Sequence, residues 1–428
     1  MQNGKCKRGV SDVSSYTRAI LAKHDPYSSL RSPSFLRLLL GLAVTTVARE
    51  GQMVIVGWQV YDMTRDPLSL GMIGLSEALP FIAIALFAGH LADRTSRKTL
   101  TVAGTFGLLL SAIALLVFTL RPELLAHGRV WPIYAVIFLS GIARSFTRPA
   151  IAALSADLVP REAYANAVTW RTSTWHFSAI CGPALGGLLY GFSGAAAGYA
   201  TVTVLMAIAM VALMLVKVEE RATQREEMTI GESLRIGLGF VWRQSVIMAA
   251  MSLDLFSVLF GGAVALLPIF ARMLGVGPQG LGVLRAAPAV GALLMGIIVA
   301  HLPPMRRAGR TLLVCVAVFG LTIIAFALSR NFFLSVFILT VGGMADNVSV
   351  IIRGTLIQTM TPQNLLGRVS AVNQIFIGSS NEIGAFESGV AARLMGTVPS
   401  VIFGGVMTLI VVAVTAWRAP QLRELREI

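Results

Sequence analysis

Ionisable side chains inside long apolar stretches are the first feature of this sequence that could carry chemistry. Acidic residues occur in such stretches at Glu50, Asp254, Glu382 and Glu387. A charge inside a bilayer costs on the order of 3 kcal/mol even on lenient scales, so such residues mark proton, ion or charged-ligand sites. Because burial favours the neutral form of a carboxyl group, it can load a proton from one compartment and release it to another. We therefore treat these four residues as candidates for proton coupling.

Arginines and other polar or aromatic residues in similar stretches are candidates for lining a binding cavity. Arg144 and Arg148 are four residues apart on one helix face, where two like charges need acidic neighbours or an anionic ligand. Asp346 and Arg353 also share a face and could pair with each other. The remaining cavity candidates are Trp58, which could equally anchor a membrane interface, and Asn373.

Structural pairing is the alternative role for several of these groups. Arg49 and Glu50 are adjacent, so their side chains diverge by about 100° and are not expected to aim at one cavity together. Asp254 lies near the end of its stretch and could be solvated there. Glu382 or Glu387 could neutralise the Arg144 region or a basic hairpin earlier in the chain.

That basic hairpin is the segment between two apolar stretches that contains Gly89, Asp93, Arg94, Arg97 and Lys98. A short basic turn of this kind is typical of the cytoplasmic face of a membrane. Glycine permits close approach of two helices, and a carboxylate can accept hydrogen bonds from neighbouring cations or from the N–H groups of a helix N-terminus. A loop that only fixes orientation is the alternative, but the ordered set of residue types favours a gating hairpin.

Composition places these residues in an integral membrane protein. Of the 428 residues, 55% are hydrophobic and 13% are charged, against about 25% charged in soluble domains. The net charge of +14 is explained by basic cytoplasmic loops on an anionic leaflet, so no nucleic-acid partner is expected. Cys6, Cys181 and Cys315 lie too far apart for a disulfide framework or a metal site. No cofactor is expected, and no phosphate-binding loop for ATP is present in the sequence.

The expected fold is all-α, with twelve transmembrane helices of roughly 20 residues or more. Their expected ranges are about Phe35–Tyr61, Leu68–Leu91, Thr99–Leu120, Trp131–Leu154, Ala163–Tyr190, Ala195–Val216, Val246–Phe270, Leu281–His301, Thr311–Leu328, Phe332–Met360, Val369–Leu394 and Val398–Trp417.

These helices predict two six-helix bundles, one at 35–216 and one at 246–417. Cytoplasmic tails are expected at 1–34 and 418–428, with a cytoplasmic linker at 217–245 whose second half is an amphipathic helix on the membrane. The third, sixth, ninth and twelfth helices carry no charge in their interiors, which predicts four outer helices around a polar central cavity.

The two halves repeat. The stretch Gly182–Gly187 is matched by Gly384–Gly389, and Pro160 precedes the first stretch by the same distance as Pro362 precedes the second. Six plus six helices in the same orientation form a parallel repeat about an axis along the membrane normal, with a binding site near mid-membrane between the halves.

Three motifs resemble those of a known family. Gly89-x-Leu91-Ala92-Asp93-Arg94-x-x-Arg97-Lys98 resembles the hairpin signature of the major facilitator superfamily, with Ser96 in place of the usual glycine. The stretch containing Gly182, Pro183, Gly186 and Gly187 is similar to the antiporter motif of its drug/proton exporters. The segments 361–369 and 384–389 resemble the branch of enterobactin (siderophore) and macrolide exporters.

The resemblance implies a secondary transporter of the inner membrane that works as a monomer and binds a small molecule, protons and lipids. It implies efflux of an amphipathic siderophore or drug-like cargo by alternating access, including multidrug resistance. The antiporter motif is then expected to pack against the eighth helix and to favour closure of the cytoplasmic route. Arg144 or Arg148 could replace the arginine that such exporters carry near Ile137. Uptake or lipid movement by the same fold is the alternative, and a receptor or enzyme is disfavoured because the longest interior connection is too short for a catalytic domain.

Overall fold

The computed structural model describes residues 25–125, 129–218, 230–303 and 305–425, apart from the side chains of residues 85–94, 230 and 233. Over these ranges the chain forms helices and no strand. The α-helices are α2 (Pro33–Thr64), α3 (Pro67–Arg94), α4 (Arg97–Leu120), α5 (Trp131–Asp157), α6 (Tyr164–Met214), α7 (Ile230–Arg243), α8 (Ser245–Phe260), α9 (Leu267–Met273), α10 (Gly277–His301), α11 (Ala308–Leu328), α12 (Phe332–Met360), α13 (Gln363–Met395), α14 (Thr397–Arg418) and α15 (Pro420–Arg423). The short 3-10 helices are η1 (Ser29–Arg31), η2 (Pro122–Leu125), η3 (Arg161–Ala163) and η4 (Ala263–Leu266).

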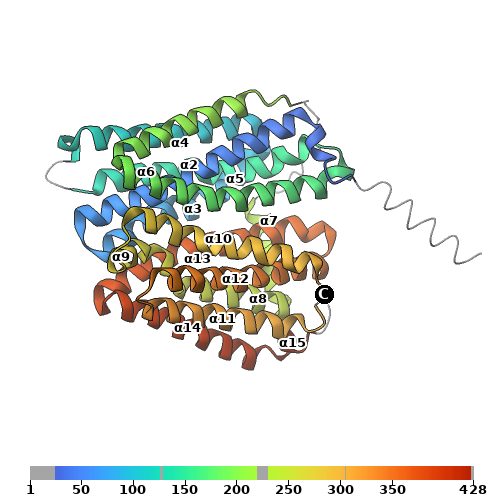
Figure 1. The fold of residues 1–428 in the computed structure, drawn as a ribbon. Coiled ribbons are helices and arrows are strands. Elements are labelled where there is room, and N and C mark those ends of the chain that lie inside the picture. Colours follow the sequence, from blue (N-terminus) through green and yellow to red (C-terminus); the bar gives the residue numbers. More distant parts are fainter. Residues whose placement is uncertain (1–24, 126–128, 219–229, 304, 426–428) are drawn as a thin grey trace, which may run out of the picture.

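The long helices form two groups that lie side by side. Figure 1 shows α2–α6 in one group and α8–α14 in the other, with their long axes running in broadly the same direction. The groups meet where α6 packs against α10 and where α3 packs against α13. The amphipathic helix α7 packs against α8 and α13 of the second group and also touches α3 of the first.

Local sequence signals set several helix ends. Ser32 caps α2 by accepting a hydrogen bond from the Phe35 N–H at 3.3 Å, and Pro33 occupies the first turn. Ser96 likewise accepts from the Thr99 N–H at 3.4 Å at the start of α4. The serine that replaces the usual hairpin glycine therefore has a structural role as the cap of α4.

The fifth and sixth expected helices are joined in α6, which spans 51 residues. Gly194 interrupts it with φ 77° and ψ 177°, a backbone conformation that residues other than glycine rarely adopt. This break lies between the two expected ranges. The expected seventh helix is also discontinuous, because α8 ends at Phe260 and the chain continues through η4 into α9.

Nine segments of the described chain are long and apolar enough to cross a membrane. Two of these segments, Arg161–Met214 and Ser245–Met273, each contain more than one helix, and the polar helices α5 and α13 are not among the nine. Apolar side chains such as Leu110 on α4, Val211 on α6 and Ile410 on α14 are exposed, as expected for outer helices that face lipid.

The two glycine-rich repeat stretches lie where the halves meet. A Cβ atom built at Gly187 would lie 2.9 Å from the Cα of Gly282 on α10, and one built at Gly389 would lie 2.6 Å from the Cα of Gly71 on α3. Any larger residue would push the backbones apart, so these glycines permit the close contact between halves. The packing of the first stretch against the eighth expected helix is confirmed.

Candidate functional site

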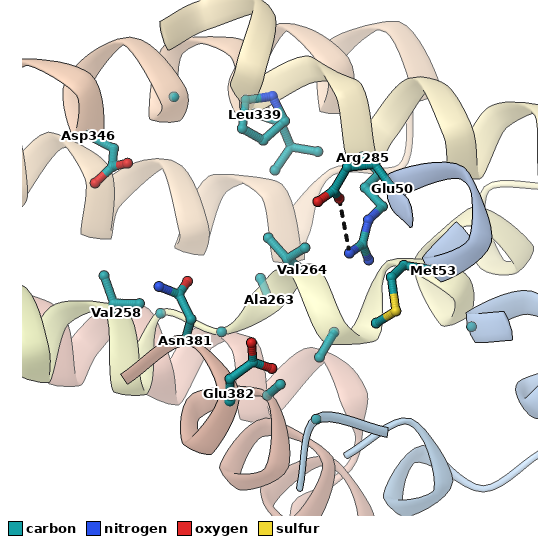
Figure 2. Close-up of a pocket in the computed structure, with 18 of the residues that line it drawn as sticks. Glu50, Met53, Val258, Ala263, Val264, Arg285, Leu339, Asp346, Asn381 and Glu382 are labelled. Carbon is teal, nitrogen blue, oxygen red and sulfur yellow. Dashed lines mark ion pairs between the residues drawn. The ribbon is translucent and has the colours of Figure 1, made fainter. Parts of the chain in front are cut away.

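A cavity of about 550 Å³ lies between the two halves, in the middle of the helices. Side chains from both groups line it, and Figure 2 shows Glu50 of the first half beside Arg285 of the second, with Asp346 and Glu382 of the second half elsewhere around the cavity. Its charged lining residues are Arg49, Glu50, Glu77, Arg144, Arg148, Arg285, Asp346 and Glu382. The predicted polar interior between two bundles is therefore present.

Six of these residues form a continuous series of ion pairs, which we call the bridging chain: Arg285, Glu50, Arg49, Glu77, Arg144 and Glu382. Within the first half, Arg49 pairs with Glu50 at 2.6 Å and with Glu77 at 3.1 Å. Glu77 also pairs with Arg144. Acids and bases alternate along the chain, so every charge has an opposite neighbour.

Both ends of the bridging chain cross to the second half. At one end Arg144 on α5 meets Glu382 on α13 at 3.0 Å. At the other end the guanidinium of Arg285 on α10 lies 3.9 Å from a Glu50 oxygen, the pair marked in Figure 2. Relative motion of the halves must lengthen or break these two contacts, whereas the pairs within the first half can persist.

Packing of α6 against α2 positions Glu50. A Cβ atom at Gly182 would lie 2.7 Å from the Glu50 Cβ, and one at Gly186 would lie 2.7 Å from the Cα of Gly51. The antiporter-like stretch thus brings α6 against the backbone that carries Glu50, while its last glycine contacts α10. Sequence reasoning predicted the second contact and missed the first.

Two charged residues of the cavity wall lie outside the bridging chain. The Arg148 guanidinium lies over the Phe81 ring, 5.9 Å from the ring centroid. Asp346 on α12 lines the cavity and is labelled in Figure 2. Among the described residues, neither side chain forms an ion pair within 4.0 Å.

A second ion pair lies within the second half, behind the cavity wall. Arg353 on α12 pairs with Asp254 on α8, and the two side chains are 4% and 9% exposed. The expected pairing of Arg353 with Asp346 is wrong. Seven residues along a helix correspond to about 10.5 Å of rise, so the aspartate on the neighbouring helix is the nearer partner.

The helix ends opposite the basic hairpin, which we call the distal end, are joined by two more ion pairs between halves. Arg272 on α9 lies 3.1 Å from Asp62 on α2, and Arg393 on α13 lies 3.2 Å from Asp66. The Arg272 guanidinium also stacks over the Trp58 ring at 5.6 Å. These pairs hold the halves together at the distal end.

Several predicted site residues are not in the cavity wall. Trp58 lies beneath Arg272 at the distal end, and Asp254 and Arg353 are buried behind the wall. Glu387 and Asn373 on α13 are half-buried and do not line the cavity. Rotation of each helix about its axis decides which of its polar residues face the cavity, and residue type alone does not fix this rotation.

Other expectations about the cavity need correction. Arg49 and Glu50 both line it and pair with each other, because their long side chains bend back toward one another. Glu77 was missed as a site residue although it joins two arginines. The ninth expected helix, α11, is not confined to the outside, since Phe319 and Thr322 line the cavity. A charge-free helix can thus supply an apolar wall.

The hairpin is described in part. The side chains of Gly89, Asp93 and Arg94 lie outside the described residues. Arg97 pairs with Asp157 at the end of α5 at 2.6 Å and donates to the Ala153 carbonyl at 3.4 Å. The hairpin is therefore joined to α5, the helix that carries Arg144 and Arg148.

These features define a transporter of the major facilitator superfamily. The superfamily model described as "Transmembrane secretion effector" matches residues 24–427, and the chain belongs to this family. The Enterobactin exporter EntS of Shigella boydii serotype 18 is 25% identical over 398 residues, which cover 92% of this chain and 94% of that protein. The protein of the same name from Escherichia coli O81 matches to the same extent.

Solved structures support the fold. A bacterial homologue of the human lysosomal transporter Spinster, in an inward-facing and occupied conformation, matches with a TM-score of 0.69 and 13% identity over 94% of this chain and 99% of that one. A D-xylose-proton symporter matches with a TM-score of 0.71 and 13% identity over 92% and 99%. At these identities the likeness concerns the fold alone.

Proposed function

We propose that this transporter exports an amphipathic small molecule, of siderophore or drug-like type, in exchange for protons. The observation that carries the proposal is the bridging chain, in which glutamates of a central cavity hold arginines of the opposite half. Export of a siderophore is supported by the relatives named as enterobactin exporters. A multi-pass protein of the inner membrane with twelve spans and both termini in the cytoplasm is consistent with the helix order and the basic loops.

The contacts at the distal end indicate which conformation the structure represents. The ion pairs of Arg272 and Arg393 join the halves at the distal end, and the glycine contact of Gly187 with α10 lies on that side too. With the basic loops in the cytoplasm, this arrangement corresponds to closure toward the outside. The antiporter-like stretch therefore closes the distal route in this conformation, whereas its expected role was closure of the cytoplasmic route.

Proton coupling would act through the two contacts that cross between the halves. Protonation of Glu382 removes the charge that holds Arg144, and protonation of Glu50 does the same for Arg285. Each event weakens one link between the halves and favours their separation on that side. Cargo binding in the cavity and proton release to the other compartment would complete the exchange.

Inverted membrane vesicles with an acidic lumen test this proposal, with enterobactin and a macrolide as cargo. We expect accumulation in the lumen that collapses when the pH gradient is dissipated. Glu50→Gln and Glu382→Gln should each lower gradient-driven accumulation by on the order of tenfold, while exchange of cargo without a gradient persists. Glu162→Gln, an exposed acid outside the cavity, is the matched control. Accumulation only with the opposite gradient would identify an uptake system and refute export.

A further inference from the structure

The charges around the cavity divide into two clusters of opposite net charge. The first is the bridging chain together with Arg148, which contains four arginines and three glutamates and so has one positive charge in excess. The second consists of Asp346 with the buried pair Asp254–Arg353, and it has one negative charge in excess. Both excess charges belong to side chains of the cavity wall.

Arg148 supplies the positive excess. It lies one turn from Arg144 on α5, and its side chain is exposed toward the cavity that it lines. The three glutamates of the bridging chain are already held by Arg49, Arg144 and Arg285. The contact of Arg148 with Phe81 is a cation–π contact, which leaves the guanidinium N–H groups available to an anionic group.

Asp346 supplies the negative excess from the other half. The arginine within its electrostatic reach, Arg353, is already paired with Asp254, so the group formed by Asp346, Asp254 and Arg353 contains two acids and one base. In Figure 2 its carboxylate and the Asn381 amide lie on one side of the cavity, away from the Glu50–Arg285 pair. No described residue neutralises this carboxylate by an ion pair within 4.0 Å.

We propose that the cavity selects an ampholytic cargo, whose anionic group binds Arg148 on α5 and whose cationic group binds Asp346 on α12. Such a cargo neutralises both excess charges at once and contacts both halves of the transporter. A purely cationic or purely anionic cargo leaves one charge of the wall without a partner in a site of restricted water, which costs binding energy. The apolar residues of α11, among them Phe319, would contact the rest of the cargo. The inference rests on the proposed function and narrows its substrate class: an ampholyte should bind more tightly than enterobactin, which has no cationic group, or a macrolide, which has no anionic group.

Three dyes on one xanthene scaffold provide the test: rhodamine B, which carries a carboxylate and a cation, rhodamine 6G, which carries only the cation, and fluorescein, which is anionic. Binding to the purified full-length transporter in detergent is measured by fluorescence anisotropy. We expect rhodamine B to bind on the order of tenfold more tightly than either of the other dyes.

Two variants assign the groups. Asp346→Asn should weaken the binding of rhodamine B and of rhodamine 6G on the order of tenfold and leave the binding of fluorescein unchanged. Arg148→Gln should weaken the binding of rhodamine B and of fluorescein and leave the binding of rhodamine 6G unchanged. Asp346→Glu and Arg148→Lys should retain most of the affinity, which shows that the sites are folded. Arg330→Gln, an exposed residue between α11 and α12, is the matched control.

The outcomes separate the inference from the proposed function. The inference is overturned if rhodamine B binds no more tightly than the other two dyes, or if both variants affect all three dyes equally. Gradient-driven export of enterobactin by the same preparation would then leave the proposed function intact. If the dyes bind with the expected charge selectivity but no cargo is exported, the proposed function is refuted and the preference of the cavity for ampholytes stands.

Discussion

The bridging chain and the Asp254–Arg353 pair are both made of buried opposite charges, but they differ in what they connect. The bridging chain links α2, α3 and α5 of the first half to α10 and α13 of the second, and its side chains are 8–23% exposed. The Asp254–Arg353 pair joins α8 to α12 within one half, and its side chains are 4% and 9% exposed.

This difference separates charges that can change partners from charges that cannot. Residues of the bridging chain face a cavity, so cargo, water or a proton can replace one partner when the halves move. The Asp254–Arg353 pair is enclosed by its own half, and among the described residues neither side chain forms another ion pair within 4.0 Å. We therefore expect substitutions in the chain to alter transport with a smaller loss of stability, and substitutions in the pair to alter mainly stability.

The largest expected effect comes from breaking the enclosed pair. Asp254→Asn leaves the Arg353 charge buried without a counter-ion, a change that typically lowers the free energy of unfolding by about 3–5 kcal/mol. Thermal unfolding of the purified protein should show a large loss of midpoint temperature. The double variant Asp254→Leu with Arg353→Met removes both charges and should recover stability.

Transport by that double variant is the decisive readout for the pair. Recovery of stability together with gradient-driven transport indicates a purely structural pair. Recovered stability without transport would show that the pair is needed for transport, as expected if Asp254 takes part in proton coupling, and would remove the distinction between the two clusters.

An intermediate effect is expected at the contacts between halves. A double-mutant cycle with Arg144→Gln and Glu382→Gln should give a coupling free energy of about 1–3 kcal/mol, because the two groups are in direct contact. The matched cycle with Arg285→Gln and Glu50→Gln joins groups 3.9 Å apart and should give a smaller value. Unfolding free energies of the four proteins in each cycle supply the measurement. Equal coupling in the two cycles would contradict the geometry of the cavity.

The sequence was sufficient to predict an all-α membrane fold and one of the close contacts between the halves. Helix positions follow from runs of apolar residues, and the Gly194 break lies where two expected helices meet. The contact of Gly187 with α10 was also predicted, because a glycine-rich helix segment indicates a close neighbour. The neutralisation of Arg144 by Glu382 was one of two alternatives, and the structure selects it.

Partner choice inside the cavity could not be derived in the same way. Glu77 joins Arg49 to Arg144 only because α2, α3 and α5 present these residues at one depth and with one rotation. The depth of a residue in the membrane can be estimated from its position in an apolar stretch. The rotation of the helix about its own axis can hardly be predicted from a single sequence. The same lack of rotational information left Glu387 among the proton-coupling candidates, although it does not line the cavity. Asp346 and Arg353 share a helix face, so the rise between them, and not rotation, prevents their pairing.

The smallest expected effect concerns the distal end, where the ion pairs between halves are exposed and not enclosed. Arg272 and Asp62 are 38% and 45% exposed, so their pair should contribute only about 0.2–1 kcal/mol and should weaken in high salt. Arg272→Gln should therefore raise the fraction of molecules open at this end by a small factor.

The measurement uses a variant without the native cysteines in which Met53, in the cavity wall, is replaced by cysteine. Its labelling rate by a maleimide that cannot cross the membrane reports opening of the distal end. Arg330→Gln at the same end should not change the rate. A labelling rate for Arg272→Gln that equals that of the control at low salt would show that the Arg272–Asp62 pair does not help to close this end, and that closure depends on the Arg393–Asp66 pair and on glycine packing.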